Sequence, residues 1–146
     1  MTPSRPVFRD LSRSDAEAVL ARNHVGRMAF VDHGLVDITP IHYVFTGGML
    51  HGRTEPGTKL VAVAHRPWVA LETDEVEAMF RWRSVVARGT FFALDRVLTP
   101  GECEATIAAI RQLVPQAFLP DDPTPQREVL FRIDIREIIG RSADDR

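Results

Sequence analysis

The pattern of apolar and polar positions predicts a helix near the N-terminus, preceded by a short extended arm. Residues 1–11 contain two prolines and no apolar periodicity, so we expect an arm over this stretch. Ser14 and Glu17 then have the spacing of a capping box ahead of an apolar run, which predicts a helix start at Ser14. The helix is expected to end near Asn23.

Strand-like segments separated by turn residues make up most of the remaining chain. DHG at 32–34 and TGG at 46–48 are typical of tight hairpin turns, which indicates consecutive antiparallel strands and not a parallel, Rossmann-like sheet. The expected strands are Val25–Val31, Val36–Phe45, Met49–Arg53, Trp68–Thr73, Arg83–Leu94 and Val129–Ile139. Two further helices are expected, at about residues 57–66 and at Pro100–Val114, followed by a Pro- and Asp-rich loop over residues 115–128.

Six mostly antiparallel strands with three helices predict a mainly β fold with the helices packed outside. We expect a small closed or partly closed barrel, because closing a sheet removes its exposed edges. The barrel is expected to be a single domain over residues 12–146, since no internal repeat or low-complexity segment divides the chain.

Composition excludes several classes of protein. A chain of 146 residues, 45% of them hydrophobic, can bury one core. A net charge of −2 argues against a nucleic-acid-binding module, and no apolar run is long enough to span a bilayer. The first residues also lack the apolar segment of a signal peptide, so we expect a cytoplasmic protein with no membrane or nucleic-acid partner.

The segment from His51 to Lys59 carries the candidate binding chemistry. It runs from the end of an expected strand, through a tight turn, into the first turn of an expected helix. Unpaired amides and a partial positive charge at a helix start favour a phosphate group, and Gly52 and Gly57 let the backbone approach an anion. The segment lacks the GxxxxGK[ST] pattern, so it is not a nucleotide-hydrolysing P-loop.

Four donor side chains lie within this segment. Arg53 can bind two phosphate oxygens with its planar guanidinium, and Lys59 adds a compact positive charge. Thr54 and Thr58 can donate hydroxyl groups. Lys59 is the only lysine among 18 basic residues; codon usage can explain the excess of arginine but not the position of the lysine. The alternative is that Thr54 caps the helix and that Arg53 and Lys59 are solvated.

The order and spacing of three segments are also informative. They are DITPIHYVF at 37–45, HGRTEPGTKL at 51–60 and WRSVVARG at 82–89. Together they resemble the pyridoxamine 5′-phosphate oxidase-related, FMN-binding split-barrel family, over roughly residues 12–95. The resemblance is closest to small bacterial members, including those similar to nitroimidazole resistance proteins. It implies a six-stranded split barrel and a homodimer with FMN at the interface.

The resemblance also implies roles for individual residues. Those implied to hold the FMN phosphate are Arg53, Thr54, Thr58 and Lys59. Those implied to run along the edge of the isoalloxazine ring, with backbone groups toward its polar atoms, are Pro40, Ile41, His42 and Tyr43. Those implied to complete the pocket from the other subunit are Trp82, Ser84 and Val85.

From this resemblance we expect an FMN-dependent oxidoreductase that acts on a small organic substrate. No Ser-His-Asp or Cys-His pattern is evident, so a cofactor is the only credible catalyst and no catalytic residue is assigned. NADH or NADPH would be a transient electron donor. Pyridoxamine phosphate oxidases carry a C-terminal strand with arginine and tryptophan, whereas residues 131–137 contain no tryptophan, so we do not expect oxidation of pyridoxine phosphate. The alternatives are F420 or haem in the same barrel, and a non-catalytic flavin-binding or storage protein.

Other features have two interpretations. Histidines at 24, 33, 42 and 51 recur every nine residues, a spacing that fits no zinc site, so no metal site is expected. His42 could donate to the flavin, ligate haem or face solvent, and His51 lies one residue from a histidine position of the nitroimidazole resistance relatives. The acidic stretch at 72–77 is expected in a solvated hairpin connection and Trp68 in the core, while Trp82, flanked by two arginines, could stack on a ring.

Overall fold

An antiparallel sheet of eight strands dominates the computed structural model, which describes residues 5–145. The elements are β1 (Pro6–Asp10), α1 (Arg13–Arg22), β2 (Val25–Asp32), β3 (Leu35–His42), β4 (Val44–Thr46), β5 (Met49–Thr54), α2 (Thr58–His65), β6 (Trp68–Ala78), β7 (Arg81–Ala93), α3 (Pro100–Leu113) and β8 (Val129–Asp145). The strand order is β3-β2-β6-β7-β8-β5-β4, and β1 pairs with β8 outside this path. The expected class, mainly β with three flanking helices, is confirmed.

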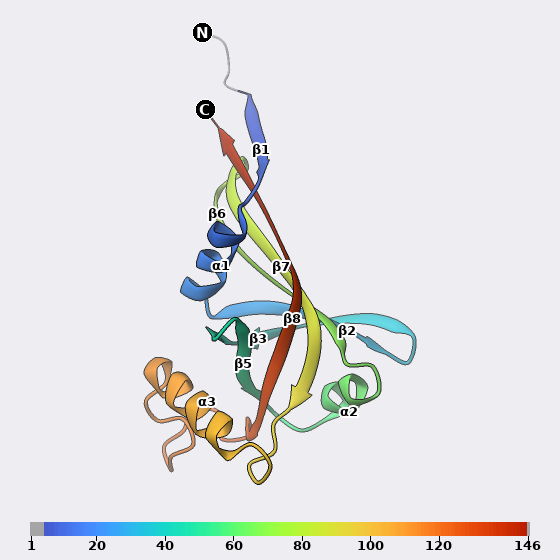
Figure 1. Ribbon diagram of the computed structural model, residues 1–146, viewed down its shortest axis with the longest axis vertical. Coiled ribbons are helices and arrows are strands. Elements are labelled where there is room, and N and C mark those ends of the chain that lie inside the picture. Colours follow the sequence, from blue (N-terminus) through green and yellow to red (C-terminus); the bar gives the residue numbers. More distant parts are fainter. Residues whose placement is uncertain (1–4, 146) are drawn as a thin grey trace.

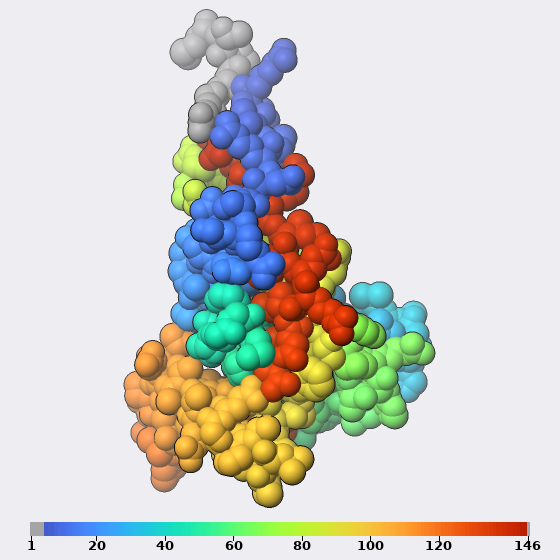
Figure 2. Space-filling model, in the orientation of Figure 1, coloured from blue at the N-terminus to red at the C-terminus, as the bar shows by residue number. Residues whose placement is uncertain are grey.

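Long strands connect the two ends of the molecule. Figure 1 shows β1, the C-terminal part of β8 and the β6–β7 hairpin together at one end, with α1 beside these strands. Helices α2 and α3 lie toward the other end, on opposite sides of the sheet. In Figure 2, α3 and its neighbouring loops form a lobe that stands apart from the β2–β3 hairpin and α2.

The two predicted hairpin turns are present because their residues adopt left-handed backbone conformations. Between β2 and β3, His33 and Gly34 have φ values of 51° and 78°. Between β4 and β5, Gly47 and Gly48 have φ values of 60° and 76°. Positive φ at both central residues is the requirement of a type I′ turn, whose twist matches that of the strands.

Two groups of buried side chains form the interior. The larger group lies between the sheet, α1 and α2, and includes Leu20, Met28, Leu50, Leu71 and Phe131. The smaller group lies under α3 and consists of Cys103, Ile110, Ala117 and Leu130. Because Leu130 belongs to β8, the α3 lobe is attached to the sheet at the start of that strand.

The sheet has more strands than the six predicted. Residues 6–10 of the expected arm pair with the end of β8, while residues 1–4 lie outside the described part of the chain. The expected strand Val36–Phe45 is divided at Tyr43, because the Tyr43 amide donates to the carbonyl of His24 at 3.0 Å and its side chain is fully buried.

Two strands are longer than predicted. β6 continues through Ala78 because it keeps pairing with β7, and β8 continues through Asp145 because it pairs with β7 as far as Ala143 and with β1 as far as Asp145. The acidic stretch at 72–77 therefore lies within β6 and not in a hairpin connection. Its Glu75 carboxylate accepts two hydrogen bonds from Arg22, at 2.6 and 2.7 Å.

Helix α1 begins earlier than predicted. Its N-cap is Ser12, whose hydroxyl oxygen accepts a hydrogen bond from the Asp15 amide at 3.1 Å, so Ser14 lies within the helix. Glu17 forms an ion pair with Arg13 at 2.7 Å instead of returning to a cap. The physical reason is that β1 stops pairing with β8 at Asp10, so the helix can begin within a few residues of that point.

Trp68 is exposed and not part of the core. Its exposed fraction is 58%, and the Arg136 guanidinium lies 4.9 Å from the centroid of its ring. A cation over the ring face covers it at the surface without burial.

The boundaries predicted for α2 and α3 agree with the structure to within about one residue. Across residues 5–145, no helix combines the length and apolar character needed to cross a bilayer.

Candidate functional site

The N-terminus of α2 is not capped by a side chain. Gly57 is the N-cap, with φ 155° and ψ −164°, a backbone conformation found almost only in glycine. Thr54 is buried in β5, so the interpretation that it caps this helix is wrong. The first amides of α2 are therefore available to an anion, at the positive end of the helix dipole.

A cavity of about 240 Å³ lies between this helix start and β3. Of the residues singled out from the sequence, it brings together Pro40, Ile41, His42, Arg53, Thr54 and Lys59. Glu55 and Arg127 complete its charged lining. Segments 40–42 and 53–55, which are separate in sequence, therefore lie around one space together with Lys59.

Two other cavities contain the remaining predicted residues of this region. Gly57 and Thr58 line a cavity of about 760 Å³ against the β2–β3 turn. Gly52 and Tyr43 line a groove of about 320 Å³, which shares His42 with the smaller cavity. The predicted phosphate residues are thus divided between two cavities, one lined by Arg53, Thr54 and Lys59 and the other by Thr58.

Lys59 is partly buried beside the charged lining of the 240 Å³ cavity. Burial lowers the pKa of its ammonium group below the ordinary value; Glu55 acts in the opposite direction, and the positive charge of Arg127 lowers the pKa further. A partly desolvated cation at an uncapped helix start is a suitable ligand for phosphate.

Arg53 is engaged by the loop before β8. Its two terminal nitrogens donate to the Asp122 carboxylate at 2.6 and 3.0 Å, and one also donates to the Thr124 hydroxyl at 2.9 Å. The bond to Arg53 holds the pKa of Asp122 well below its usual range, and bonds from the Phe118 and Thr124 amides add to this. The Arg53 side chain is only 6% exposed, so it is not solvated, and its fork binds Asp122 in this structure.

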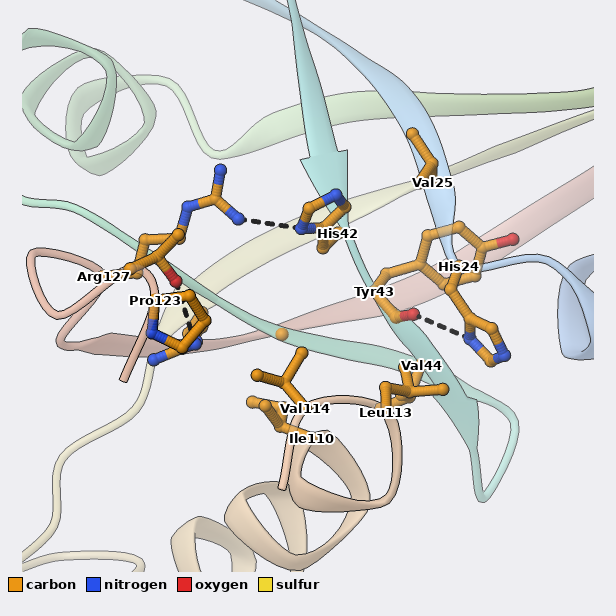
Figure 3. A pocket seen from close by; sticks show the side chains of 13 residues that line it. His24, Val25, His42, Tyr43, Val44, Ile110, Leu113, Val114, Pro123 and Arg127 are labelled. Atoms are coloured by element: carbon orange, nitrogen blue, oxygen red, sulfur yellow. Dashed lines mark hydrogen bonds between the residues drawn. The ribbon is translucent and has the colours of Figure 1, made fainter. Parts of the chain in front are cut away.

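His42 and Arg127 meet at the boundary between the cavity and the groove, as Figure 3 shows. Arg127 Nη1 lies 2.8 Å from His42 Nδ1. A guanidinium can only donate, so His42 Nδ1 is the acceptor and the ring is neutral, with its proton on Nε2. Partial burial lowers the pKa of His42, and the charges of Arg127 and Arg53 lower it further.

The groove is apolar and lies between α3 and the β3–β4 junction. Figure 3 shows Ile110, Leu113 and Val114 from the end of α3 on one side, and Val25 with Tyr43 on the other. The Tyr43 hydroxyl donates to the carbonyl of Leu20 at 2.9 Å, and desolvation raises its pKa to about 12. The groove thus offers a mainly apolar surface, with His42 and Arg127 at one end and His24 beside Tyr43 at the other (Figure 3).

Gly52 is required by close packing. A Cβ at this position would lie 2.5 Å from the carbonyl oxygen of His42 and 2.6 Å from the ring of Phe131. The absence of a side chain lets β5 approach the end of β3 at a point where Gly52 also lines the groove.

Trp82, Ser84 and Val85 do not line these cavities. Val85 is fully buried in the core of its own chain, and the Ser84 hydroxyl donates to Glu72 at 3.0 Å. The ring of Trp82 packs near Phe8, with centroids 6.2 Å apart. All three lie on the half of β7 that is remote from α2 (Figure 1).

His51 is buried away from the cavity. Its Nε2 lies 2.9 Å from Glu102 and its Nδ1 3.1 Å from the Thr46 hydroxyl. Glu102 also accepts two hydrogen bonds from Arg132, so His51 forms part of the attachment of α3 to β5 and β8. Between residues 5 and 145, no three or more His, Cys, Asp or Glu side chains gather as they would around a metal ion.

Sequence reasoning missed the contribution of residues 115–128. Asp122, Thr124 and Arg127 all reach the site, although this stretch was expected only to form a loop. The one local signal was the concentration of Asp and Pro, which indicates ordered turns as well as loops.

Comparison with known proteins agrees with this architecture. The family described as pyridoxamine 5′-phosphate oxidase matches residues 12–142. The chain belongs to this family. The resemblance seen in the three sequence segments is therefore confirmed, over a longer part of the chain than the roughly 84 residues first recognised.

Relatives of this family member share its length. An uncharacterized protein of Rhizobium meliloti is 28% identical over 145 residues, covering 92% of this chain and 95% of the relative. The crystal structure of an FAD-binding protein from Mesorhizobium loti has a TM-score of 0.78 and 25% identity, covering 92% and 97% of the two chains. A candidate 5-nitroimidazole antibiotic resistance protein from Bacteroides thetaiotaomicron has a TM-score of 0.72 with 13% identity, covering 97% and 90%, and shows the common fold.

Proposed function

We propose that this family member binds FMN, with the phosphate in the cavity between the start of α2 and β3. The observation that carries the proposal is that Thr54 and the partly buried Lys59 line one space, and that Lys59 lies in the first turn of α2, whose N-terminus no side chain caps. Backbone amides, a hydroxyl from Thr54 and an ammonium group are donors suited to a phosphate. The similarity to the FAD-binding protein of Mesorhizobium loti supports a flavin as the ligand.

The flavin ring would lie along β3. This strand is at one end of the strand order, so only β2 pairs with it among the described strands. Its other edge presents backbone polar groups, which need partners when buried. This edge supports the implied position of residues 40–43 beside the polar atoms of the ring.

When bound, the flavin supplies the redox chemistry, for which NADH or NADPH is the proposed transient donor. The chain's own residues bind and orient: Lys59 holds the charged end, and the apolar groove beside His42 offers space for a small organic substrate. The absence of tryptophan from residues 131–137 argues against pyridoxine phosphate as that substrate.

We further propose that the active form is a homodimer. The β2–β3 hairpin exposes Leu35, Val36 and Ile38 by 74%, 80% and 61%, and exposed apolar side chains this close together favour an interface. In a dimer, the remote half of β7, with Trp82 and Ser84, could approach the partner's flavin site, as the family resemblance implies. Light scattering of the purified protein should give twice the mass of 16.4 kDa, and a monomer would contradict this part of the proposal.

FAD is the second candidate cofactor. The cavity of about 760 Å³ at Gly57 and Thr58 adjoins the start of α2, so a group larger than a monophosphate could continue into it. Titration with FMN and FAD under the same conditions compares the two. Tighter binding of FAD by tenfold or more would replace FMN in this proposal.

The direct test is the absorption spectrum of the purified protein, followed by titration with FMN. We expect a flavin spectrum, or saturable quenching of FMN fluorescence by the apoprotein. A haem spectrum, F420 fluorescence or the absence of flavin binding would contradict the proposal. Rapid mixing with NADH or NADPH then separates an oxidoreductase, whose flavin bleaches, from a storage protein, whose flavin stays oxidised.

A further inference from the structure

The 240 Å³ cavity carries an excess of positive charge. Lys59, Arg53 and Arg127 line it, and Glu55 is the acidic residue in its lining. The charge of Arg53 is matched by Asp122 at 2.6 Å. Across residues 5–145, neither Lys59 nor Arg127 has a carboxylate oxygen within the 4.0 Å of an ion pair. The cavity therefore suits an anion, and the cations that remain for it are Lys59 and Arg127.

Arg127 is held at this position by a short, bonded turn. Asp122 accepts the Thr124 amide at 2.9 Å, and the Thr124 carbonyl accepts the Arg127 amide at 3.0 Å. Arg53 fixes the same turn, because it binds both Asp122 and Thr124. The buried arginine thus orders the backbone from which the half-buried Arg127 extends.

The guanidinium of Arg127 is only partly used within the described structure. Its Nη1 donates to the neutral His42, while no acceptor in residues 5–145 bonds its other nitrogens. A planar guanidinium can donate two parallel hydrogen bonds to an anion. Its positive charge acts on two of the other basic groups of the cavity, since it lowers the pKa of His42 and that of Lys59. An anion bound between Arg127 and Lys59 would relieve the repulsion between their charges.

We propose that Arg127 is the arginine that binds the cofactor phosphate, together with Lys59, and that Arg53 is a positioning residue that holds the turn carrying Arg127. This inference rests on the proposed FMN function, and it reassigns the phosphate arginine from β5 to the loop before β8. It follows from the occupied fork of Arg53, the available fork of Arg127 and the cavity that Arg127 shares with Lys59.

The test compares FMN with riboflavin, which lacks the phosphate, in the wild type and in Arg127→Ala. We expect FMN affinity to fall by about tenfold to a hundredfold, as for one charge-assisted contact, with riboflavin affinity changed less than about twofold. Arg13→Ala removes an exposed arginine of α1 and should change neither affinity. Arg127→Lys keeps the charge without the fork and should retain part of the preference for FMN.

The outcomes separate this inference from the proposed function. Suppose that the wild type prefers FMN to riboflavin. If Arg127→Ala leaves the ratio of the two affinities unchanged, even with both affinities reduced, Arg127 does not bind the phosphate and only the inference is overturned. If the wild type binds neither ligand, the proposed function fails and the inference fails with it.

A double substitution tests whether Arg53 acts through Arg127. Because Arg53→Ala leaves a buried carboxylate, it is combined with Asp122→Asn. When introduced into the wild type, the double substitution should reduce the ratio of FMN affinity to riboflavin affinity. When introduced into Arg127→Ala, it should not reduce this ratio further. If the fold losses in this affinity ratio instead multiply when all three substitutions are combined, Arg53 contacts the phosphate itself, and its positioning role is overturned.

Discussion

Replacement of Lys59 by alanine should separate recognition of the phosphate from recognition of the flavin ring. The ammonium group is partly buried at the uncapped start of α2, so a phosphate there gains both a charge-assisted hydrogen bond and a poorly screened attraction. Such a bond contributes roughly 1.5–3 kcal/mol to the free energy of binding. Its loss in Lys59→Ala should therefore raise the dissociation constant of FMN about 10- to 150-fold. Riboflavin binding should change by less than about twofold.

The assay is quenching of flavin fluorescence by the apoprotein, with Arg13→Ala as the control for loss of one positive charge. Arg13 is exposed on α1 and paired with Glu17. An equal loss of affinity for FMN and riboflavin in Lys59→Ala would refute the reasoning, because it would show that Lys59 supports the fold or the ring and not the phosphate.

The single lysine permits a second measurement on the unmodified protein. Burial lowers the pKa of Lys59, so at mildly alkaline pH a larger fraction is the neutral, nucleophilic amine than for an ordinary lysine. An amine-reactive reagent should therefore modify Lys59 readily in the apoprotein, as measured by mass spectrometry. A bound phosphate would block the amine and raise its pKa, so FMN should protect it and riboflavin should not. Equal protection by both ligands would contradict the phosphate contact.

Three further predictions concern stability and pH. Gly52→Ala should lower the free energy of unfolding by roughly 1–3 kcal/mol, because the new Cβ would lie 2.5 Å from a backbone carbonyl; Gly101→Ala, with open space, is the control, and equal melting temperatures of the two variants would contradict this. Tyr43, the only tyrosine, should ionise near its pKa of about 12 in a spectrophotometric titration of the apoprotein, so its contribution to stability is complete below about pH 10 and is lost as pH rises toward 12; ionisation at an ordinary pKa in the folded protein would argue against its burial. The hydrogen bond from Arg22 is the main cause that lowers the pKa of Glu75 to about 2, so Glu75 should stabilise the fold above about pH 4.5 and lose this effect as pH falls toward 2. Glu75→Gln should therefore weaken the dependence of the free energy of unfolding on acid pH. An unchanged acid transition would count against the Arg22–Glu75 pair.

Features set by neighbouring residues were predicted well from the sequence. The glycine turns at 32–34 and 46–48 predicted the hairpins, because positive φ values are a local property of these residues. The apolar spacing of α3 predicted its extent to within one residue. The segment 51–59 was predicted to run from a strand into a helix start, which is where β5 ends and α2 begins.

Features that depend on distant pairing were not predicted. Residues 6–10 are a strand only because β8 lies beside them, and the polar end of β8 is a strand only because β1 and β7 pair with it. The N-cap of α1 is Ser12 and not the predicted Ser14, because the pairing of β1 with β8 decides where the chain leaves the sheet. Trp68 is covered at the surface by Arg136, a contact that no local pattern indicates.

For this protein, the sequence alone determined the order of the elements, the family and the segment that offers donors to a phosphate, since turn residues, periodicity and short motifs are local. Only the tertiary structure decided which donors are available. Arg53 is bound by Asp122, 69 residues away, and Arg127 reaches His42 across 85 residues. The physical reason is that a guanidinium binds whichever acceptor the fold places beside it, so its role depends on packing and not on its position in a motif.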